Sequence, residues 1–543
     1  MRGSRRIAAW LAAALAVGGV VAAAAGEPIP PPEELEARGA VIGNIRLVPR
    51  DIFDTSIPGE NGWLYRAANK LHIETKPSVI RGQLLFKTGD PYRRRLVEET
   101  ERILRSKNYL YEASIVPVAF DGRTVDLEVR TRDVWTLNPG LNFNRKGGTN
   151  TFGLQIEENN LLGTGQQLAL KWDDNVDRES LTLSFIDPHF RHSFTRLAVA
   201  YSDADDGDTK VFGIDRPFYA LDTRWSAGTY LSDSLRNDVR YALGENVGEF
   251  EHREERYELR GGWSRGLVGG WAQRWTYGIT YTRDGFGLDP LEPPGGPLPE
   301  DRELLYPWVG FELVEDRFQE RTNQDQILRT EDVLVGLRAG GRLGVSFAGA
   351  GSDRDAFIMS AYVQNGADLS RRQSLFGSAT ISGRLEGGAV VNGILSGEAR
   401  FYRATSRRSK FFAAVSGAVT EQLDHEYQLL LGGDNGLRGY PLRYQAGTAR
   451  ALLTLEQRYY TDWYPFRLFH VGGAAFFDMG RTWGQDVTGL ESSGLLRDLG
   501  IGLRLGSSRT SFGNVIHIDL AFPLDGNGNI DDVQLLVQTK GSF

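Results

Sequence analysis

The sequence predicts a transmembrane β-barrel of about 16 antiparallel strands, preceded by one small α+β domain. Three features of the 543 residues lead to this prediction: an N-terminal export signal, a long run of alternating strand segments, and an amphipathic last strand that ends on Phe543. Mean hydropathy is −0.33, a value usual for a water-soluble chain. A barrel strand turns only every second residue towards lipid, so this low value is also compatible with a membrane barrel.

The first 25 residues have the order of a secretory signal peptide. Arginines and no acids occupy Met1–Arg6, an almost wholly apolar run follows over Ile7–Ala25, and the run ends on small residues. Basic, apolar and small segments in this order direct a chain to export. The alternative is an N-terminal membrane anchor, which the Ala- and Gly-rich run and the small-residue site disfavour. No cysteine follows the run, so we expect no lipid attachment there.

Composition argues against several classes of function. The chain has no cysteine, so an exported protein must be stable without disulfides and has no thiolate for catalysis or zinc binding. The net charge of −8 disfavours binding of nucleic acid through its phosphates. The histidines form no HExxH pattern, and no Gly-x-Ser-x-Gly or phosphate-loop motif is present. We therefore expect no enzyme, no cofactor, no metal and no nucleic-acid partner.

A small mixed domain is predicted at the front of the mature chain. Residues 26–39 are rich in Pro and Glu and are predicted to form a linker. Residues 40–134 combine helical and strand periods, and the clearest helix covers 93–108. The expected elements, in chain order, are a strand at 42–48, helices at 77–86 and 93–108, and strands at 113–120 and around 125–130.

From residue 135 to residue 543 the pattern is that of strands. Alternating segments are separated by Gly, Asp, Asn and Ser, and no helix of clear amphipathic period interrupts them. At ~9–11 residues per crossing plus turns, this length suits about 16 strands with a polar interior. The 11 Trp, 20 Tyr and 27 Phe fit aromatic girdles at two membrane interfaces. A secreted β-propeller or stacked sandwiches are the alternative, but we find no fixed-period repeat.

The last strand carries a strong local signal. Its alternate residues are mostly apolar, and the chain ends on an aromatic residue. This combination is typical of the strand by which barrels are recognised for membrane insertion, whereas an ordinary final strand is the alternative. The residues of this C-terminal signal are Val533, Leu535, Val537, Gly541 and Phe543.

A Gly-rich segment with one arginine, 429–441, lies between two predicted strands. The Arg438 guanidinium is always charged and forms a planar fork suited to carboxylates. Strand alternation turns Glu456 and Asp478 towards the barrel interior, because the opposite assignment would place charges in hydrocarbon. An inward-folded loop would let Arg438 pair with such carboxylates. The Arg-Gly-Tyr sequence by itself favours the alternative, a solvated surface loop.

This segment, LLLGGDNGLRGYP, resembles the inward-folded loop of the BamA/TamA outer-membrane assembly superfamily, the bacterial surface antigen family. Position 437 is Leu where the family often has Val or Ile. The segment FFDMGRTW is similar to the family's Asp-x-Gly strand motif, with Gly480 as its glycine. Residues 40–134 resemble the single POTRA domain of such proteins. The resemblance implies that the lumenal loop motif is Leu437, Arg438, Gly439 and Tyr440, and that its wall partners are Glu456, Asp478 and Gly480. We therefore expect Arg438 to pair with Glu456 and Asp478 and to hold the loop inside the barrel.

The resemblance implies a POTRA-type periplasmic domain over 40–134, an outer-membrane barrel over 135–543, and a loop, 424–447, folded into the barrel. It implies a factor that assembles, inserts or translocates other proteins, with a lateral seam between the first and last strands. The implied partners are outer-membrane lipid and lipopolysaccharide, client outer-membrane or secreted polypeptides, and accessory periplasmic or lipoprotein subunits. The alternatives are a secretion transporter for an unfolded partner, a passive outer-membrane channel, and a soluble secreted β-protein.

Overall fold

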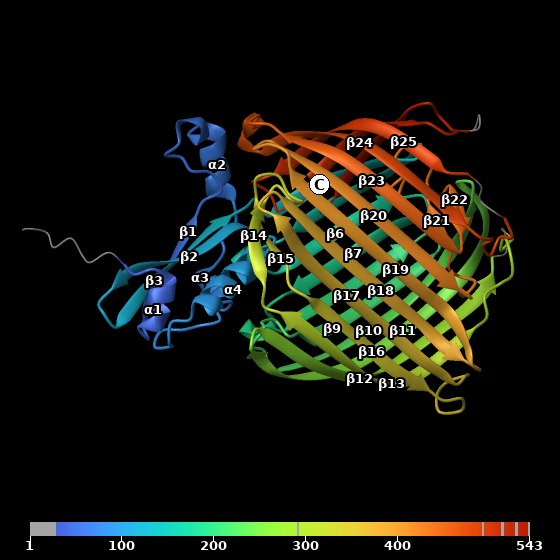
Figure 1. Ribbon diagram of the computed structural model, residues 1–543, viewed down its shortest axis with the longest axis horizontal. Helices are drawn as coiled ribbons and strands as arrows, with labels where there is room; N and C mark the ends of the chain where they lie inside the picture. Colours follow the sequence, from blue (N-terminus) through green and yellow to red (C-terminus); the bar gives the residue numbers. More distant parts are fainter. Residues whose placement is uncertain (1–28, 290–292, 491–493, 512–514, 527–529, 541–543) are drawn as a thin grey trace, which may run out of the picture.

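The computed structural model describes residues 29–289, 293–490, 494–511, 515–526 and 530–540. The predicted signal peptide, Gly541 and Phe543 lie outside these ranges. A large closed β-barrel carries a small α+β domain at one end, which we call the front domain (Figure 1). Within the described residues, no helix is long and apolar enough to cross a membrane.

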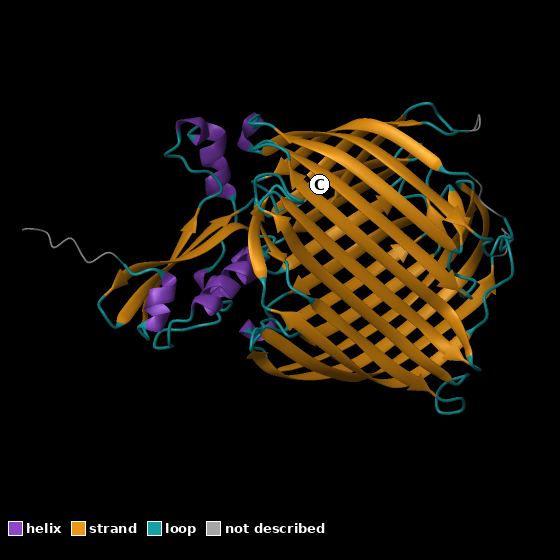
Figure 2. Cartoon of the chain, viewed as in Figure 1, coloured by secondary structure: helices purple, strands orange, loops and turns teal. Residues whose placement is uncertain are grey.

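The barrel is antiparallel and has 20 strands in the described residues, so the prediction of about 16 is wrong. Each crossing uses less chain than expected, because many neighbouring strands are joined by turns of only two residues. Gly147 and Gly148, both with positive φ, are the whole connection between the first two barrel strands. The strand lattice is visible in Figure 2. Neighbours in the barrel follow chain order, and the last strand, β27, closes onto the first, β4.

The strands and their bounds are as follows. The barrel comprises β4 (Leu137–Lys146), β5 (Thr149–Glu158), β6 (Gln167–Asp174), β7 (Glu179–Asp187), β8 (Arg196–Ala204), β9 (Gly207–Arg216), β10 (Trp225–Ala242), β11 (Glu245–Val268), β12 (Trp271–Leu288), β13 (Arg302–Glu315), β16 (Arg338–Ser346), β17 (Ala356–Ser370), β18 (Gln373–Glu386), β19 (Ala389–Ala404), β20 (Ser409–Glu421), β23 (Ala449–Tyr460), β24 (Phe469–Trp483), β25 (Leu496–Ser507), β26 (Val515–Pro523) and β27 (Gln534–Lys540). Two separate hairpins are β14 (Phe318–Thr322) with β15 (Thr330–Leu334), and β21 (Leu429–Leu431) with β22 (Gln445–Gly447).

The side chains of the barrel strands alternate between an apolar outer face and a polar inner face. On β25, Leu499, Ile501 and Leu503 are exposed on the outside. Arg504 of the same strand and Asp519 of β26 are fully buried inside. A wall that is apolar outside and charged inside is what a barrel needs to stand in lipid.

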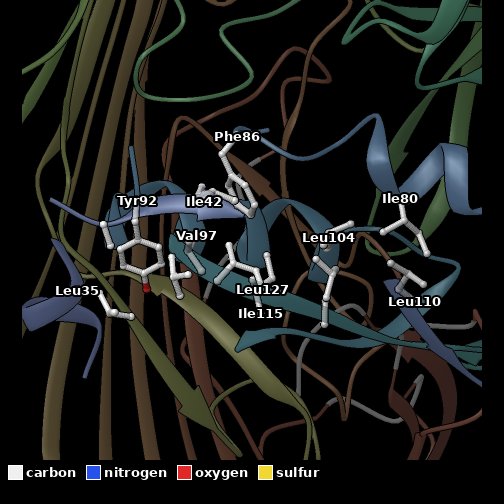
Figure 3. Close-up of a cluster of buried hydrophobic side chains, with 14 of the residues drawn as sticks. Leu35, Ile42, Ile80, Phe86, Tyr92, Val97, Leu104, Leu110, Ile115 and Leu127 are labelled. Atoms are coloured by element: carbon white, nitrogen blue, oxygen red, sulfur yellow. The ribbon is translucent and has the colours of Figure 1, made fainter. Parts of the chain in front are cut away.

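The front domain packs helices against a three-stranded sheet of order β1-β3-β2. Its elements are α1 (Pro32–Ala37), β1 (Val41–Arg50), α2 (Trp63–Leu71), α3 (Pro77–Arg81), α4 (Arg94–Arg105), β2 (Leu110–Phe120) and β3 (Thr124–Asp133). β3 pairs in parallel with β1 and antiparallel with β2. Leu104, Ile115 and Leu127 belong to its apolar core (Figure 3).

Two helices of the front domain differ from the expectations. The predicted linker, 26–39, contains α1, whose Leu35 is fully buried in the domain core. Pro32 and two glutamates in its first turn suit a helix start, but one apolar residue is too weak a pattern to predict it. The helix α2 was not expected either. The helix predicted over 77–86 is only the short α3.

The front domain is fixed to the near rim of the barrel by one buried and one partly buried ion pair. Arg509, in the turn after β25, lies 2.6 Å from Glu60, and both side chains are buried. Arg105 of α4 lies 2.6 Å from Asp332 of β15. Removing one partner of a buried pair leaves the other charge uncompensated, so such contacts restrain the domain against the rim.

Glu101 of α4 is expected to make the front domain less stable as the pH rises from about 5 to about 8. Burial raises the pKa of its carboxyl to about 7, against the opposing effects of the Ile115 N–H, which donates to it, and the Arg105 charge. The folded state therefore binds this proton more tightly than the unfolded state. The resulting stabilisation, on the order of 2 kcal/mol, is complete below about pH 4.5 and is lost as the pH rises through 7.

Hydrogen exchange of the α4 and β2 amides, corrected for its intrinsic pH dependence, measures this effect. The variant Glu101→Gln should flatten the profile. Glu98→Gln changes a carboxylate on the same helix that is 44% exposed, and it should leave the profile unchanged. Equal slopes for wild type and Glu101→Gln would contradict the assignment.

Candidate functional site

The long connection between β20 and β23 folds back against the barrel wall. Its β21 and β22 form a small hairpin at the barrel end away from the front domain (Figure 1). In the segment that joins β21 to β22, Leu437 and Tyr440 are fully buried and pack with Leu431 and with Leu496 of the wall. The predicted loop region, 424–447, therefore has its own small core against the wall instead of lying in solvent.

Arg438 lies at the centre of a buried ion cluster. Its Nε and Nη2 donate to the two Asp478 oxygens at 2.6 and 2.9 Å, and its Nη1 donates to Glu456 Oε1 at 2.7 Å. The guanidinium stacks on the Phe476 ring, 3.4 Å from the ring centre. The structure thus brings together the arginine and the two carboxylates that the sequence singled out. The bidentate contact with Asp478 is the geometry that arginine forms best with a carboxylate.

The cluster is larger than the sequence indicated. Arg458 donates to Glu456 Oε2 at 3.0 Å, and Arg504 pairs with Asp519. Asp519 Oδ2 also lies 3.7 Å from Arg438. Arg458 lies two residues from Glu456 on β23, whereas Arg504 and Asp519 lie on the neighbouring strands β25 and β26. The second pair can be recognised only once the strand register is known. These charges can be buried together because charges of opposite sign lie next to one another.

Glycines and a tyrosine fix the loop tip against the wall. Gly439 N–H donates to Asp498 Oδ2 at 3.0 Å, and a β-carbon at this position would lie 2.6 Å from the Asp498 β-carbon. Only glycine permits so close an approach. The Tyr440 hydroxyl lies 2.8 and 2.9 Å from the carbonyl oxygens of Arg497 and Asp525, either of which can accept its proton. These two residues belong to β25 and to the connection after β26. Gly480 similarly admits Leu431 of β21, whose Cδ2 would lie 3.0 Å from an added β-carbon.

The β14–β15 hairpin is a second segment that folds onto the inner wall, and it contacts the same cluster from the other side. The Gln324 carbonyl accepts from Arg458 Nη1 at 3.0 Å, and the Asn323 carbonyl accepts from the Tyr460 hydroxyl. Ile327 is buried against β23, β24 and β26. Arg105 of the front domain pairs with Asp332 in the middle of the hairpin. The hairpin therefore contacts α4 on one side and, through the Gln324 carbonyl, the ion cluster of Arg458, Glu456 and Arg438 on the other.

The barrel closes at a weak seam. In the described residues, β27 and β4 share the single register pair Val537–Arg145, whereas β26 and β27 pair continuously from Val515–Lys540 to Ala521–Gln534. The lumenal loop lies close to this seam, since a β-carbon at Gly147 would lie 2.2 Å from the Leu442 nitrogen. Arg438 therefore anchors a loop that contacts the first turn of the barrel as well as the wall.

The residues of the C-terminal signal that the structure describes alternate with buried ones. Val533 and Leu535 are exposed and Val537 is half-buried, whereas Leu536 is fully buried. Of the predicted C-terminal signal, these three residues can be placed. Within the described part of the chain, no group of His, Asp and Glu has the arrangement of a metal site.

Fold and site together define a closed membrane-type barrel with an inward-anchored loop and a front domain on one rim. No family model matches the sequence. Among solved structures, the chain is similar in fold to BamA from Haemophilus ducreyi lacking POTRA domains 1–3, at 12% identity and a TM-score of 0.37, over 92% of this chain and 84% of that one.

Two further similar structures are CdiB proteins. CdiB from Escherichia coli is 15% identical with a TM-score of 0.45, over 93% of this chain and 77% of that one. CdiB from Acinetobacter baumannii is 12% identical with a TM-score of 0.43, over 92% and 73%. These likenesses concern the fold, and the function is argued below from the chain's own contacts.

Proposed function

We propose that this chain is an outer-membrane barrel of the BamA/TamA type that inserts other polypeptides into the membrane or translocates them across it. The front domain would be its single periplasmic POTRA domain, and the site residues would be Arg438 with Glu456 and Asp478. The observation that carries the proposal is a loop anchored by a buried arginine next to a seam of one register pair.

A weak seam provides a template for a new strand. Unpaired N–H and C=O groups of a strand edge are costly in lipid, because no water can satisfy them. An incoming β-strand that pairs with the edge of β4 or β27 satisfies these groups and can begin a new barrel wall. The anchored loop keeps the neighbouring wall in place while β4 or β27 pairs with the client strand instead of with the other. This exchange of strand pairing requires no nucleotide.

The front domain offers an entry point for the client chain. β2 lies at the edge of the sheet, with β3 on one side only. Near the barrel its edge is engaged by Arg105, which donates to the Ala113 carbonyl. The part of β2 further from the barrel can accept an extended peptide by strand addition.

A passive channel is less well supported than this proposal. The loop packs on the wall at one end of the lumen, and the β14–β15 hairpin packs on the wall at the other end. Both segments reduce the open cross-section, and their anchors are ion pairs and buried apolar side chains rather than mobile contacts.

Reconstitution tests the proposed function. Vesicles that contain the purified protein should accelerate the insertion of an unfolded outer-membrane barrel client, measured by heat-modifiable gel mobility, relative to vesicles with an unrelated passive barrel. Depletion in the cell should lower the amounts of particular outer-membrane or secreted proteins in a proteome census. No acceleration and an unchanged census, with normal ion conductance, would favour the channel.

A further inference from the structure

The helix α2 is amphipathic, but its apolar face points away from the protein and its polar face packs against it. Trp63, Leu64 and Leu71 lie on one side of the helix, since these positions fall within about a third of a turn of one another. They are 71%, 60% and 70% exposed. An unpartnered apolar face of this size on a nine-residue helix indicates a contact with something other than water.

The opposite face of α2 is polar and is the one that contacts the protein. Asn69 accepts from the Phe53 N–H at 3.0 Å and donates to the Phe53 carbonyl at 2.8 Å. Tyr65 packs on the Phe53 ring. The helix is therefore held in a defined orientation, and its apolar side chains are presented outward rather than left loose.

The helix is attached to the barrel rim at the turn between β23 and β24. The Tyr65 hydroxyl donates to the Phe466 carbonyl, and the Arg467 guanidinium packs directly on Gly59. Figure 1 shows α2 at the upper edge of the front domain, beside this rim. The turn itself exposes Trp463 and Phe466 by 63% and 77%.

This patch continues the lipid-facing wall of the barrel. Tyr459, the outward residue near the end of β23, is half-exposed and precedes the turn with Trp463 and Phe466. Exposed aromatic residues at the end of a membrane strand are typical of the interface between hydrocarbon and headgroups. Arg66 and Lys70 lie beside the apolar face of α2, where they can reach anionic headgroups.

We propose that α2 and the 461–468 turn form a membrane-surface contact, in which the apolar face of α2 lies in the phospholipid leaflet on the front-domain side. The occupant is the lipid surface, because the patch is continuous with the lipid-facing wall and has basic residues at its edge. The contact ties the front domain to the membrane beneath strands β23 to β26, close to the seam. This goes beyond the proposed function and requires only that the barrel stands in a bilayer.

Depth-dependent fluorescence quenching tests the proposal, and the absence of native cysteines makes single labels simple. The full chain is reconstituted in vesicles of phosphatidylethanolamine and phosphatidylglycerol with an environment-sensitive label at Leu64→Cys. The two reference variants are Ile501→Cys on the lipid-facing wall and Arg123→Cys in a solvent-exposed turn. Quenching is measured with a spin-labelled lipid and, separately, with iodide in the water.

The expected result is that lipid quenching at Leu64→Cys reaches at least about half of that at Ile501→Cys, with weak iodide quenching. Adding Leu71→Asp should shift the label towards the behaviour of Arg123→Cys. Strong iodide quenching without lipid quenching would overturn the proposal. So would shielding from both quenchers, which would assign the face to a second copy or another protein. Absence of lipid quenching at Ile501→Cys would instead overturn the membrane barrel itself, independently of client insertion.

Discussion

Replacement of Arg438 by alanine is expected to release the lumenal loop and to abolish most of the client-insertion activity. The substitution leaves the buried carboxylates of Asp478 and Glu456 without their main counter-charge. Loss of one member of a buried ion pair typically costs about 3–5 kcal/mol. A loss of this much free energy is enough to open the loop locally. The protection of the amides over 432–444 against hydrogen exchange should therefore fall by about a hundredfold or more.

Hydrogen exchange over 432–444 and the vesicle-insertion assay measure these two effects. The matched control is Arg443→Ala, which removes a loop arginine that pairs with Asp177 at 2.6 Å but is less buried. Arg443→Ala should lower the amide protection of the loop far less, since part-exposed ion pairs contribute only about 1 kcal/mol or less to stability. Arg438→Lys should rescue only partly, because an ammonium cannot bind Asp478 through two parallel bonds. Wild-type protection and activity in Arg438→Ala would refute the anchoring role.

A covalent link across the seam is expected to stop client insertion and leave the barrel folded. Val537 and Arg145 are register partners, so Val537→Cys with Arg145→Cys brings two thiols to facing positions of antiparallel strands. Oxidation should reduce the insertion rate to that of empty vesicles, since the strand edges can no longer accept a client strand. Reduction should restore the rate. The gel shift of the oxidised form and the insertion assay are measured on the same sample.

The control for this experiment is a cross-link between β26 and β27, the strand pair next to the seam. Ile518 and Val537 are register partners in the continuous β26–β27 ladder, and the pair Ile518→Cys with Val537→Cys adds the same bond where no opening is needed. This variant should keep its activity when oxidised. If the seam cross-link leaves insertion intact, a lateral seam is not the route of the client.

The front domain and the loop arginine illustrate what a sequence can predict. The strand expected around 125–130 forms within β3, and its alternating apolar residues Val125, Leu127 and Val129 all lie in the core. Arg438, Glu456 and Asp478 could be named because the segments around them resemble the loop and strand motifs of the BamA/TamA superfamily. The inward orientation of the two carboxylates followed from the cost of placing a charge on a lipid-facing position.

Other features were hidden because they depend on distant parts of the chain. Asp498 and Asp519 are two acids among many until strand register brings them beside the loop tip and Arg504. The β14–β15 hairpin has no unusual composition, and only the barrel wall explains why Ile327 is buried. The strand number was misjudged because turn lengths, not strand patterns, determine how much chain each crossing uses.

The sequence by itself determined the class of architecture, since alternation with period two over four hundred residues or so permits little else than a closed sheet with two different faces. It also determined which charges must face inward. The tertiary structure alone decided how these charges pair, where the barrel closes, and that α2 turns its apolar face outward. Pairing and closure are contacts between residues far apart in the chain, and no local periodicity encodes them; they follow from strand register and from the docking of the front domain on the rim.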